Sequence, residues 1–181
     1  MKEYADAVAK AVAETEHGCR DHDAATERLC DALKQHSGGK VVFIGNGGSM
    51  SACTHMANDL CLAFGTAIAL DSVANMSCIG NDMGYSNVFS SQLKWFFNPG
   101  DTLVALSCSG KSPNILNAVD YVRTASRAKH IITFSGFDSN NPLRGGGDLN
   151  FWVPSTSYGV VQIAHEIILH SAIDRIAGLK L

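Results

Sequence analysis

The sequence lacks an excess of basic charge, a membrane-length apolar run and the apolar core of a secretion signal. Its 181 residues include 14 Lys and Arg against 17 Asp and Glu, for a formal net charge of −3. Broad binding to nucleic acid needs a basic face, so this balance argues against nucleic-acid partners. No stretch approaches the roughly 18 consecutive apolar residues of a membrane span, and the N-terminus is polar. We therefore expect a cytoplasmic protein with no membrane or nucleic-acid partner.

The chain also lacks any Cys-x-x-Cys pair, the spacing found in many zinc and redox sites. Its six cysteines are Cys19, Cys30, Cys53, Cys61, Cys78 and Cys108. Most of them lie in apolar segments, and free cysteine behaves as a small hydrophobic residue. We predict buried, reduced thiols, which agrees with a cytosolic protein. Apolar residues make up 46% of the chain and charged residues 17%, which indicates a globular domain with a substantial core.

Segments of strand and helix character alternate along residues 38–181, which predicts an α/β core. The expected strands are Lys40–Ile44, Thr66–Leu70, Asp101–Leu106, Lys129–Phe134 and Leu149–Val153. The first is a continuous apolar run, the pattern of a parallel strand buried on both faces. One expected helix ends at about Phe64, the others span about Asn87–Phe97, Pro113–Arg127 and Tyr158–Ala177, and a polar, turn-rich stretch follows Leu70. With no linker or repeat, residues 1–181 predict a single domain whose parallel sheet is covered on both faces.

Two further helices are predicted ahead of this core, within residues 1–37. They run from about Lys2 to Gly18 and from about Asp23 to Gln35. The second ends before the pair Gly38 and Gly39, which is a typical helix stop. A small sheet does not need both helices to cover it. They could therefore pack on the sheet or on another subunit, and the amphipathic pattern does not separate the two cases.

The first core strand is followed by a glycine-rich loop, Gly45-Asn46-Gly47-Gly48-Ser49. Ligands of doubly wound sheets bind at the carboxyl ends of the strands, near the point where the strand order reverses. Glycine lets the backbone approach a ligand closely, and the helix start behind Ser49, a good N-cap residue, offers free N–H groups to an anion. The loop has neither the Walker A spacing nor a clean G-x-G-x-x-G pattern. Purely structural glycines would look similar, so the loop alone does not distinguish a ligand site from a structural turn.

The third core strand is followed by a serine-rich loop, Ser107-Cys108-Ser109-Gly110-Lys111-Ser112. Hydroxyl groups and backbone amides at a helix start replace the water around a phosphate dianion. Taken alone, the loop could also be a capping turn. Because two such loops each end a buried strand of one sheet, we predict a phosphate-binding site between them.

A third group of residues has the chemistry of a metal or acid–base site. His55 and Asp59 are four residues apart and share one helix face. Gln162 and His170 are eight apart on the last helix, and Glu166 with His170 forms a rival pair at i, i+4 spacing. Histidine, carboxylate and amide oxygen can bind zinc, and the same groups can move a proton between neighbouring carbons. An ordinary surface pair or a structural histidine would give the same spacing.

These motifs, in this order, resemble the phosphoheptose isomerases, a branch of the sugar isomerase (SIS) superfamily. The resemblance covers nearly the whole chain and adds the segments His55–Leu60 and Gly80–Asp82 to the two loops and the last helix. It implies a three-layer αβα sandwich with a five-stranded parallel sheet, of flavodoxin or Rossmann type. It also implies a homotetramer with sites between subunits, in which residues 1–37 form an oligomer interface.

The resemblance also implies an activity and a set of site residues. The reaction is the conversion of sedoheptulose 7-phosphate to D-glycero-D-manno-heptose 7-phosphate through an enediol, the first step of heptose biosynthesis. By position, substrate contacts fall on Asn46, Gly47, Gly48, Ser49, Asn81, Asp82 and Gln162, and phosphate contacts on Ser107, Cys108, Ser109 and Ser112. The implied ligands of one zinc ion per site are His55, Asp59, Gln162 and His170. Asp59 is the implied base and His170 the implied acid.

Three departures from the family pattern keep alternatives open. Asp59 stands where the family usually has Glu, Cys108 replaces a hydroxyl residue, and the segment before Gln162 is one residue shorter. One alternative is an isomerase of a different sugar phosphate. Another is a non-catalytic SIS protein of the replication initiator-associating type, which binds a protein partner. A sugar-phosphate sensor would need a DNA-binding module that the sequence does not contain. Because all four implied ligands are present, we favour the enzyme.

Overall fold

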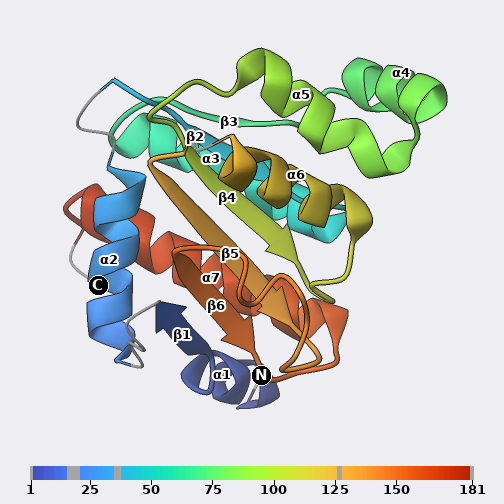
Figure 1. The fold of residues 1–181 in the computed structure, drawn as a ribbon. Helices are drawn as coiled ribbons and strands as arrows, with labels where there is room; N and C mark the ends of the chain where they lie inside the picture. The colour runs from blue at the N-terminus through green and yellow to red at the C-terminus, as the bar shows by residue number, and fades with distance from the viewer. Residues whose placement is uncertain (1, 16–20, 35–37, 126–127, 180–181) are drawn as a thin grey trace.

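The structure, a computed structural model, describes residues 2–15, 21–34, 38–125 and 128–179. These residues fold around one six-stranded sheet with the order β1-β6-β5-β4-β2-β3 (Figure 1). The strands are β1 Val12–Thr15, β2 Val41–Ile44, β3 Ala67–Ala69, β4 Thr102–Ser107, β5 His130–Gly136 and β6 Leu149–Val153. The helices are α1 Lys2–Ala9, α2 His22–Leu33, α3 Gly48–Ala63, α4 Val73–Met83, α5 Val88–Phe96, α6 Pro113–Thr124 and α7 Tyr158–Ile176, with a 3-10 turn, η1 Tyr85–Asn87.

Strands β2 to β6 form the predicted five-stranded parallel sheet. β4 lies at its centre, pairing with β2 on one side and β5 on the other. From β2 the chain crosses to β3 on the outer edge and then returns to β4 on the opposite side of β2. The strand order therefore reverses between β2 and β4. That reversal places the loops after these two strands next to each other, at the edge where ligands of such sheets bind.

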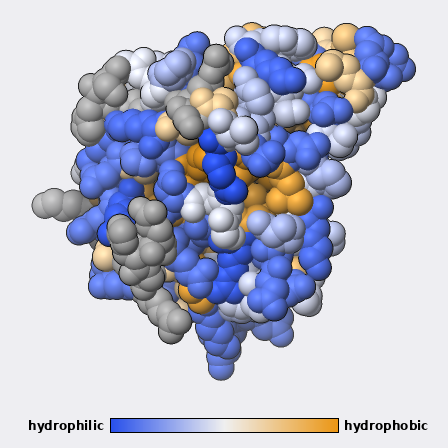
Figure 2. All heavy atoms as spheres, viewed as in Figure 1, coloured by the Kyte–Doolittle hydropathy of each residue, from blue (hydrophilic) through white to orange (hydrophobic). Residues whose placement is uncertain are grey.

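Helices cover both faces of the sheet, which gives the predicted three-layer αβα sandwich. α2, α3 and α7 pack on one face, against a cluster that includes Phe43, Phe134 and Phe151. α4, α5 and α6 pack on the other face, around Phe89 and its apolar neighbours. Figure 2 shows a largely hydrophilic outer surface in this view, with hydrophobic residues gathered toward the middle. Among the described residues, no helix is long and apolar enough to cross a membrane.

The prediction of the first helix is wrong in its second half. The observed helix α1 ends at Ala9, and Val12–Thr15 form the strand β1, which pairs antiparallel with β6 at the sheet edge. The sheet is therefore mixed and has six strands rather than five. The residues alternate as a strand requires: Ala11 and Ala13 are buried, whereas the Glu14 side chain turns outward.

An arginine from outside the sheet holds this edge strand in place. The Arg144 guanidinium donates two hydrogen bonds to the Glu14 carboxylate, with N···O distances of 2.9 and 2.6 Å. It also lies over the Trp152 ring of β6, 4.2 Å from the ring centre. The bidentate, stacked geometry is one that arginine supplies and lysine does not.

The second opening helix is confirmed as α2, and it packs on the sheet of its own chain through Ala25, Leu29 and Leu33. Four positions named in the predictions lie outside the described residues: the expected helix termini Gly18, Gln35 and Arg127, and the cysteine Cys19. α4 was not predicted, because the polar residues after Leu70 suggested turns. Ser72 caps this helix by accepting a hydrogen bond from the Asn75 backbone N–H at 3.3 Å.

The five described cysteines are all free, as predicted, but only three are buried. Cys30, Cys53 and Cys108 are buried, and burial raises the pKa of each thiol. Cys61 and Cys78 are exposed. The buried thiols therefore act as small apolar side chains.

The buried histidine His165 leads to a prediction about acid stability. Its Nε2 lies 3.0 Å from the Ser135 carbonyl oxygen, and burial lowers its pKa from 6.5 to about 4. Between these two values the unfolded chain binds a proton that the folded chain does not. Stability contributed by neutral His165 is therefore complete above pH 6.5 and falls as the pH drops toward 4. Because of this residue, we expect the free energy of unfolding to fall by about 3 kcal/mol between pH 6.5 and pH 4.

Urea unfolding of the wild type and His165→Gln at pH 7 and pH 4 measures this effect. The variant should be less stable at pH 7 and should lose less stability on acidification than the wild type. An identical pH dependence in both proteins would contradict the assignment.

Candidate active site

The two predicted ligand loops meet at one edge of the sheet. β2 and β4 are neighbours in register, with Ile44 opposite Ala105, so the loops that follow them emerge side by side. Between them lies a pocket of about 210 Å³. Its lining comprises Asn46, Ser49, Leu106, Ser107, Cys108, Ser109, Ser112, Tyr158 and Gln162. Seven of the predicted substrate or phosphate contacts are therefore gathered in one pocket.

The glycine-rich loop turns the chain sharply from β2 into α3. Gly47 has a φ of +52°, a left-handed conformation that favours glycine, and it caps α3 without a side-chain hydrogen bond. A Cβ atom on Gly45 would lie 2.8 Å from the Ser49 carbonyl carbon. Ser49 is therefore not the N-cap that we predicted. It lies in the first helical turn, where its buried Oγ is 3.7 Å from Cys108 Sγ and lines the pocket.

The serine-rich loop is held in shape by its own hydroxyl groups. Ser107 Oγ donates to Ser112 Oγ at 3.2 Å, and the Lys111 backbone N–H donates to Ser109 Oγ at 3.2 Å. Ser112 precedes α6 as its N-cap but makes no side-chain capping bond. Ser112 lines the pocket, and its hydroxyl accepts the hydrogen bond from Ser107. This arrangement fits the predicted phosphate loop.

Three helices begin at the pocket. α3 starts at Gly48, α6 follows Ser112, and α7 starts at Tyr158. Each helix start carries a partial positive charge and unsatisfied N–H groups. The convergence favours an anionic ligand, although no lysine or arginine in the described part of the chain lines the pocket.

Gln162 closes the pocket from α7. Its amide packs so closely on Gly48 that a Cβ atom there would lie 2.5 Å from Gln162 Oε1. Ser49 hydrogen bonds to the Cys108 thiol, and the polar Gln162 amide also faces this thiol. Burial raises the pKa of this thiol, and these polar contacts oppose the shift only in part. Cys108 is therefore a neutral thiol at neutral pH and a weak hydrogen-bonding partner for a ligand.

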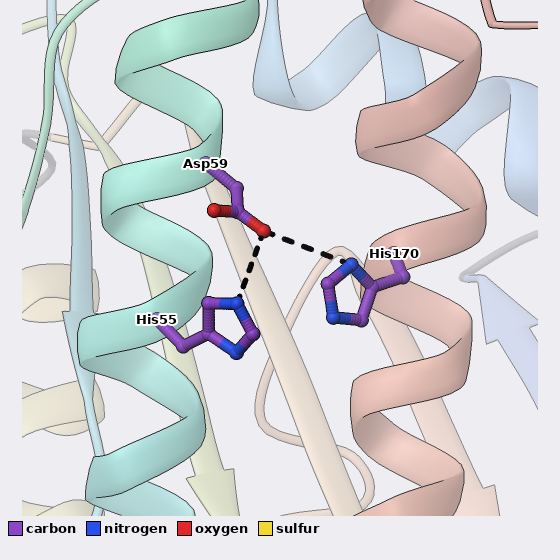
Figure 3. A group of neighbouring side chains, drawn as sticks. All are labelled: His55, Asp59 and His170. Atoms are coloured by element: carbon purple, nitrogen blue, oxygen red, sulfur yellow. Dashed lines mark ion pairs between the residues drawn. The ribbon is translucent and has the colours of Figure 1, made fainter.

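A cluster of two histidines and one carboxylate lies farther along α3 and α7 (Figure 3). Asp59 Oδ2 is 3.3 Å from His55 Nε2 and 3.8 Å from His170 Nδ1. The two rings meet edge to face, with their centres 5.1 Å apart. The side chains of His55, Asp59 and His170 are 55%, 27% and 38% exposed. No ion pair joins the rival Glu166 to His170 within the described ranges, so Asp59 supplies the carboxylate that pairs with His170.

The donor set of this cluster fits zinc. Its three ligand atoms lie within 4.8 Å of one another. Two histidines and a carboxylate are a known ligand set of catalytic zinc, with a fourth position left for water or substrate. Around a tetrahedral ion such ligands are roughly 3.4 Å apart, so modest side-chain rotation would bring them to an ion.

Gln162, the fourth predicted ligand, lines the pocket and contacts Gly48, and its place among the zinc ligands stays a prediction. It lies eight residues before His170, which is about 12 Å along a helix axis. α3 and α7 run side by side in the same direction, since Gly48 contacts Gln162 near their starts and Asp59 contacts His170 farther on. The pocket and the cluster therefore lie toward opposite ends of one helix pair.

Asn81 and Asp82 do not line the pocket in this single chain. Both are exposed at the end of α4, where Asn81 Nδ2 donates to Asp82 Oδ1 at 2.7 Å.

The nearby Tyr85 was not predicted as a site residue, yet its hydroxyl donates to Asn46 Oδ1 at 3.1 Å. Two more residues were missed. Tyr158 lines the pocket, and Asn114 hydrogen bonds to Asn46.

Comparison with known proteins identifies the family. A sequence model of the SIS domain matches residues 3–132. The phosphoheptose isomerase of Enterobacter sp. (strain 638) is 34% identical over 155 residues, which cover 82% of this chain and 78% of the relative. The chain belongs to the phosphoheptose isomerase family of SIS-domain proteins.

Solved structures agree with this assignment. The phosphoheptose isomerase of Francisella tularensis superposes with a TM-score of 0.77 and 31% identity, covering 86% of this chain and 85% of that one. The enzyme of Neisseria gonorrhoeae gives a TM-score of 0.75 and 28% identity, with 86% of each chain covered. The predicted family and the predicted sandwich are thus confirmed, and the phosphoheptose isomerases to which the chain belongs are sugar-phosphate isomerases. The roles of individual residues, zinc and the tetramer remain predictions.

The serine-rich loop of this phosphoheptose isomerase homologue contains Gly110 in a conformation and environment that favour glycine. Its φ is +63°, and a Cβ atom would lie 1.8 Å from Asn141 Oδ1. We expect Gly110→Ala to lower the unfolding free energy by about 2–4 kcal/mol, because a left-handed alanine costs about 1–2 kcal/mol and the clash adds to it. Gly100→Ala is the matched control, since Gly100 has a φ of +92° and no atom within 4 Å of the added Cβ. Equal losses in urea unfolding would show that the close packing on Asn141 is unimportant.

Proposed function

We propose that this protein interconverts sedoheptulose 7-phosphate and D-glycero-D-manno-heptose 7-phosphate, the first step of heptose biosynthesis. The family assignment supports a sugar-phosphate isomerase, and the relatives above carry the name phosphoheptose isomerase. The observation that carries the catalytic proposal is the shared Oδ2 of Asp59 between His55 and His170. A binding protein needs only the phosphate pocket, whereas isomerisation also needs acid and base groups of the kind that this cluster contains.

In this proposal the phosphate group binds in the serine-rich loop. Ser107, Ser109 and Ser112 present hydroxyl groups to the pocket, and the start of α6 lies directly behind them. Neutral hydroxyls and helix N–H groups can hold a phosphate dianion without a cationic side chain. The sugar chain then extends along the α3–α7 pair.

The length of the substrate suits this arrangement. The eight bonds from C1 to phosphorus of an extended heptose 7-phosphate span roughly 10 Å, at about 1.2 Å of reach per bond. The cluster lies about 12 Å from the pocket along α7. A phosphate in the serine-rich loop therefore leaves the carbonyl end of the sugar near Asp59 and His170.

The cluster has the groups that proton transfer requires. Asp59 removes the proton from C1 of the ketose while His170 donates a proton to the C2 carbonyl oxygen, which gives the enediol. Asp59 then returns the proton to C2, and His170 accepts the proton of the C1 hydroxyl, which gives the aldehyde. Both histidines pair with Oδ2, so Oδ1 of Asp59 has no ion-pair partner in the cluster. A zinc ion held by His55, Asp59 and His170 would supply a Lewis acid that polarises the carbonyl.

The surface around the cluster supports the proposed homotetramer. Leu62 on α3 and both Ile163 and Ile167 on α7 are exposed large apolar side chains. Exposed apolar groups clustered near a polar site are typical of subunit interfaces. A second copy packed here would exclude water from the cluster and place the site between subunits.

We expect His170→Ala to abolish isomerisation while binding of the sugar phosphate persists, because His170 belongs to the cluster and not to the pocket. Asp59→Asn should also be inactive, since an amide cannot accept the proton. Aldehyde formation from sedoheptulose 7-phosphate measures activity, and calorimetry measures binding. His22→Ala, a change at an exposed histidine at the start of α2, is the control. An active His170→Ala would remove this residue from the mechanism.

Loss of a histidine from the cluster should also change the metal content. We expect about one zinc per site in the wild type and a clear loss in His55→Ala, measured by elemental analysis after purification and after zinc addition. A wild type that takes up no added zinc would rule out the ligand assignment. If zinc binds but sedoheptulose 7-phosphate gives no product, the isomerase of a different sugar phosphate or the non-catalytic alternative gains support.

The serine-rich loop is tested by comparing charged and neutral ligands. We expect Ser109→Ala and Ser112→Ala each to weaken binding of a phosphorylated sugar about 3- to 30-fold, since each removes a hydrogen bond to an anion. Binding of the unphosphorylated sugar should change little. Equal losses for both ligands would show that these hydroxyls do not hold the phosphate.

A further inference from the structure

The Asn46 side chain, which lines the pocket, is held by two residues from outside the predicted site. Asn46 and Asn114 pair through their amides: Asn46 Nδ2 donates to Asn114 Oδ1 at 3.0 Å, and Asn114 Nδ2 donates to Asn46 Oδ1 at 2.8 Å. The Tyr85 hydroxyl donates a further hydrogen bond to Asn46 Oδ1, at 3.1 Å. Asn114 is buried at the start of α6, whereas Tyr85 lies in η1 and is 55% exposed.

The backbone of α6 decides which way these amides face. A reciprocal amide pair keeps both hydrogen bonds when both amides are turned over, so the pair alone has two equivalent arrangements. The Ile115 backbone N–H donates to Asn114 Oδ1 at 3.1 Å. A backbone N–H can only donate, so this bond requires an oxygen at that position. It fixes the orientation of Asn114 and, through the pair, that of Asn46.

Counting hydrogen bonds shows what Asn46 has left for a ligand. An asparagine side chain offers two acceptor sites on its oxygen and two N–H donors. Both acceptor sites of Asn46 Oδ1 are occupied, by Tyr85 and Asn114. One N–H of Asn46 donates to Asn114, and its second N–H has no hydrogen-bond partner among the described residues. Asn46 therefore presents a donor, and not an acceptor, to the pocket that it lines.

We propose that Asn114 and Tyr85 are positioning residues that lock the Asn46 amide with one N–H free for an oxygen atom of the phosphorylated sugar. The proposal deepens the proposed function and rests on it for the identity of the ligand. Asn114 begins α6 behind the serine-rich loop, and Asn46 belongs to the glycine-rich loop, so their pair also ties the two loops together. Asn117 of α6 donates to the Ser86 carbonyl at 3.1 Å and holds the η1 segment beside them.

The fixed orientation of the Asn46 amide, called the lock below, can be tested first without any ligand. In ¹⁵N-labelled wild-type protein, the Asn46 side-chain amide is assigned by its loss in Asn46→Asp. We expect one of its two protons to exchange slowly with water, because it is bonded to Asn114, and the other to exchange fast. Tyr85→Phe should shift this pair of signals, while Tyr121→Phe, a change on the same helix as Asn114 but outside the network, should not. Two fast-exchanging Asn46 protons in the wild type would overturn the lock, whether or not the protein proves to be an isomerase.

Binding then tests whether the lock matters for the ligand. We expect Tyr85→Phe to weaken binding of sedoheptulose 7-phosphate about 3- to 10-fold, the effect of one net hydrogen bond. In an Asn46→Ala background the same change should weaken binding less than about twofold, because Tyr85 acts only through Asn46. Equal losses in both backgrounds, or no loss in the wild-type background, would contradict the proposal. If wild-type protein does not bind this sugar, the same cycle is measured with inorganic phosphate, and the proposed function alone is withdrawn.

Discussion

The parallel pairing of β2 with β4 is the interaction on which the site depends. These strands are adjacent in the sheet although β3 lies between them in the sequence. Because the strand order reverses there, the glycine-rich and serine-rich loops leave the sheet together, and three helix starts converge on the space between them. The buried apolar residues of both strands stabilise this pairing from the two sides of the sheet. That geometry suits an anionic ligand, although no lysine or arginine of the described residues lines the pocket.

The packing of α3 beside α7 links this pocket to the chemistry. One end of the helix pair closes the pocket through Gly48 and Gln162, and the other brings Asp59 to His170. Both contacts are set by the same parallel alignment of the two helices. Under the proposed function, this alignment would set phosphate recognition and proton transfer about 12 Å apart, close to the length of a seven-carbon sugar phosphate. The amide pair between Asn46 and the buried Asn114 ties the two loops together at the pocket end.

Much of this could be predicted from the sequence where local patterns agree with the tertiary environment. The apolar runs of β2 and β4 and the glycine and serine loops behind them are local signals, and so is the His55 and Asp59 spacing. β1 was missed because Lys2–Ala13 is rich in alanine and reads as helix, whereas pairing with β6 and the contact of Glu14 with Arg144 favour a strand. Tyr85 and Asn114 were missed because their role arises only from contacts with Asn46, distant in sequence.

The measurement that tests the account most directly is the reaction of sedoheptulose 7-phosphate with the protein in D₂O, followed by NMR. Proton transfer through Asp59 and an enediol predicts an aldehyde product that carries deuterium at C2, because the carboxyl proton can exchange with solvent. Asp59→Asn should give neither product nor exchange. Absence of product from the wild type, or product formed with no deuterium at C2, would contradict the account.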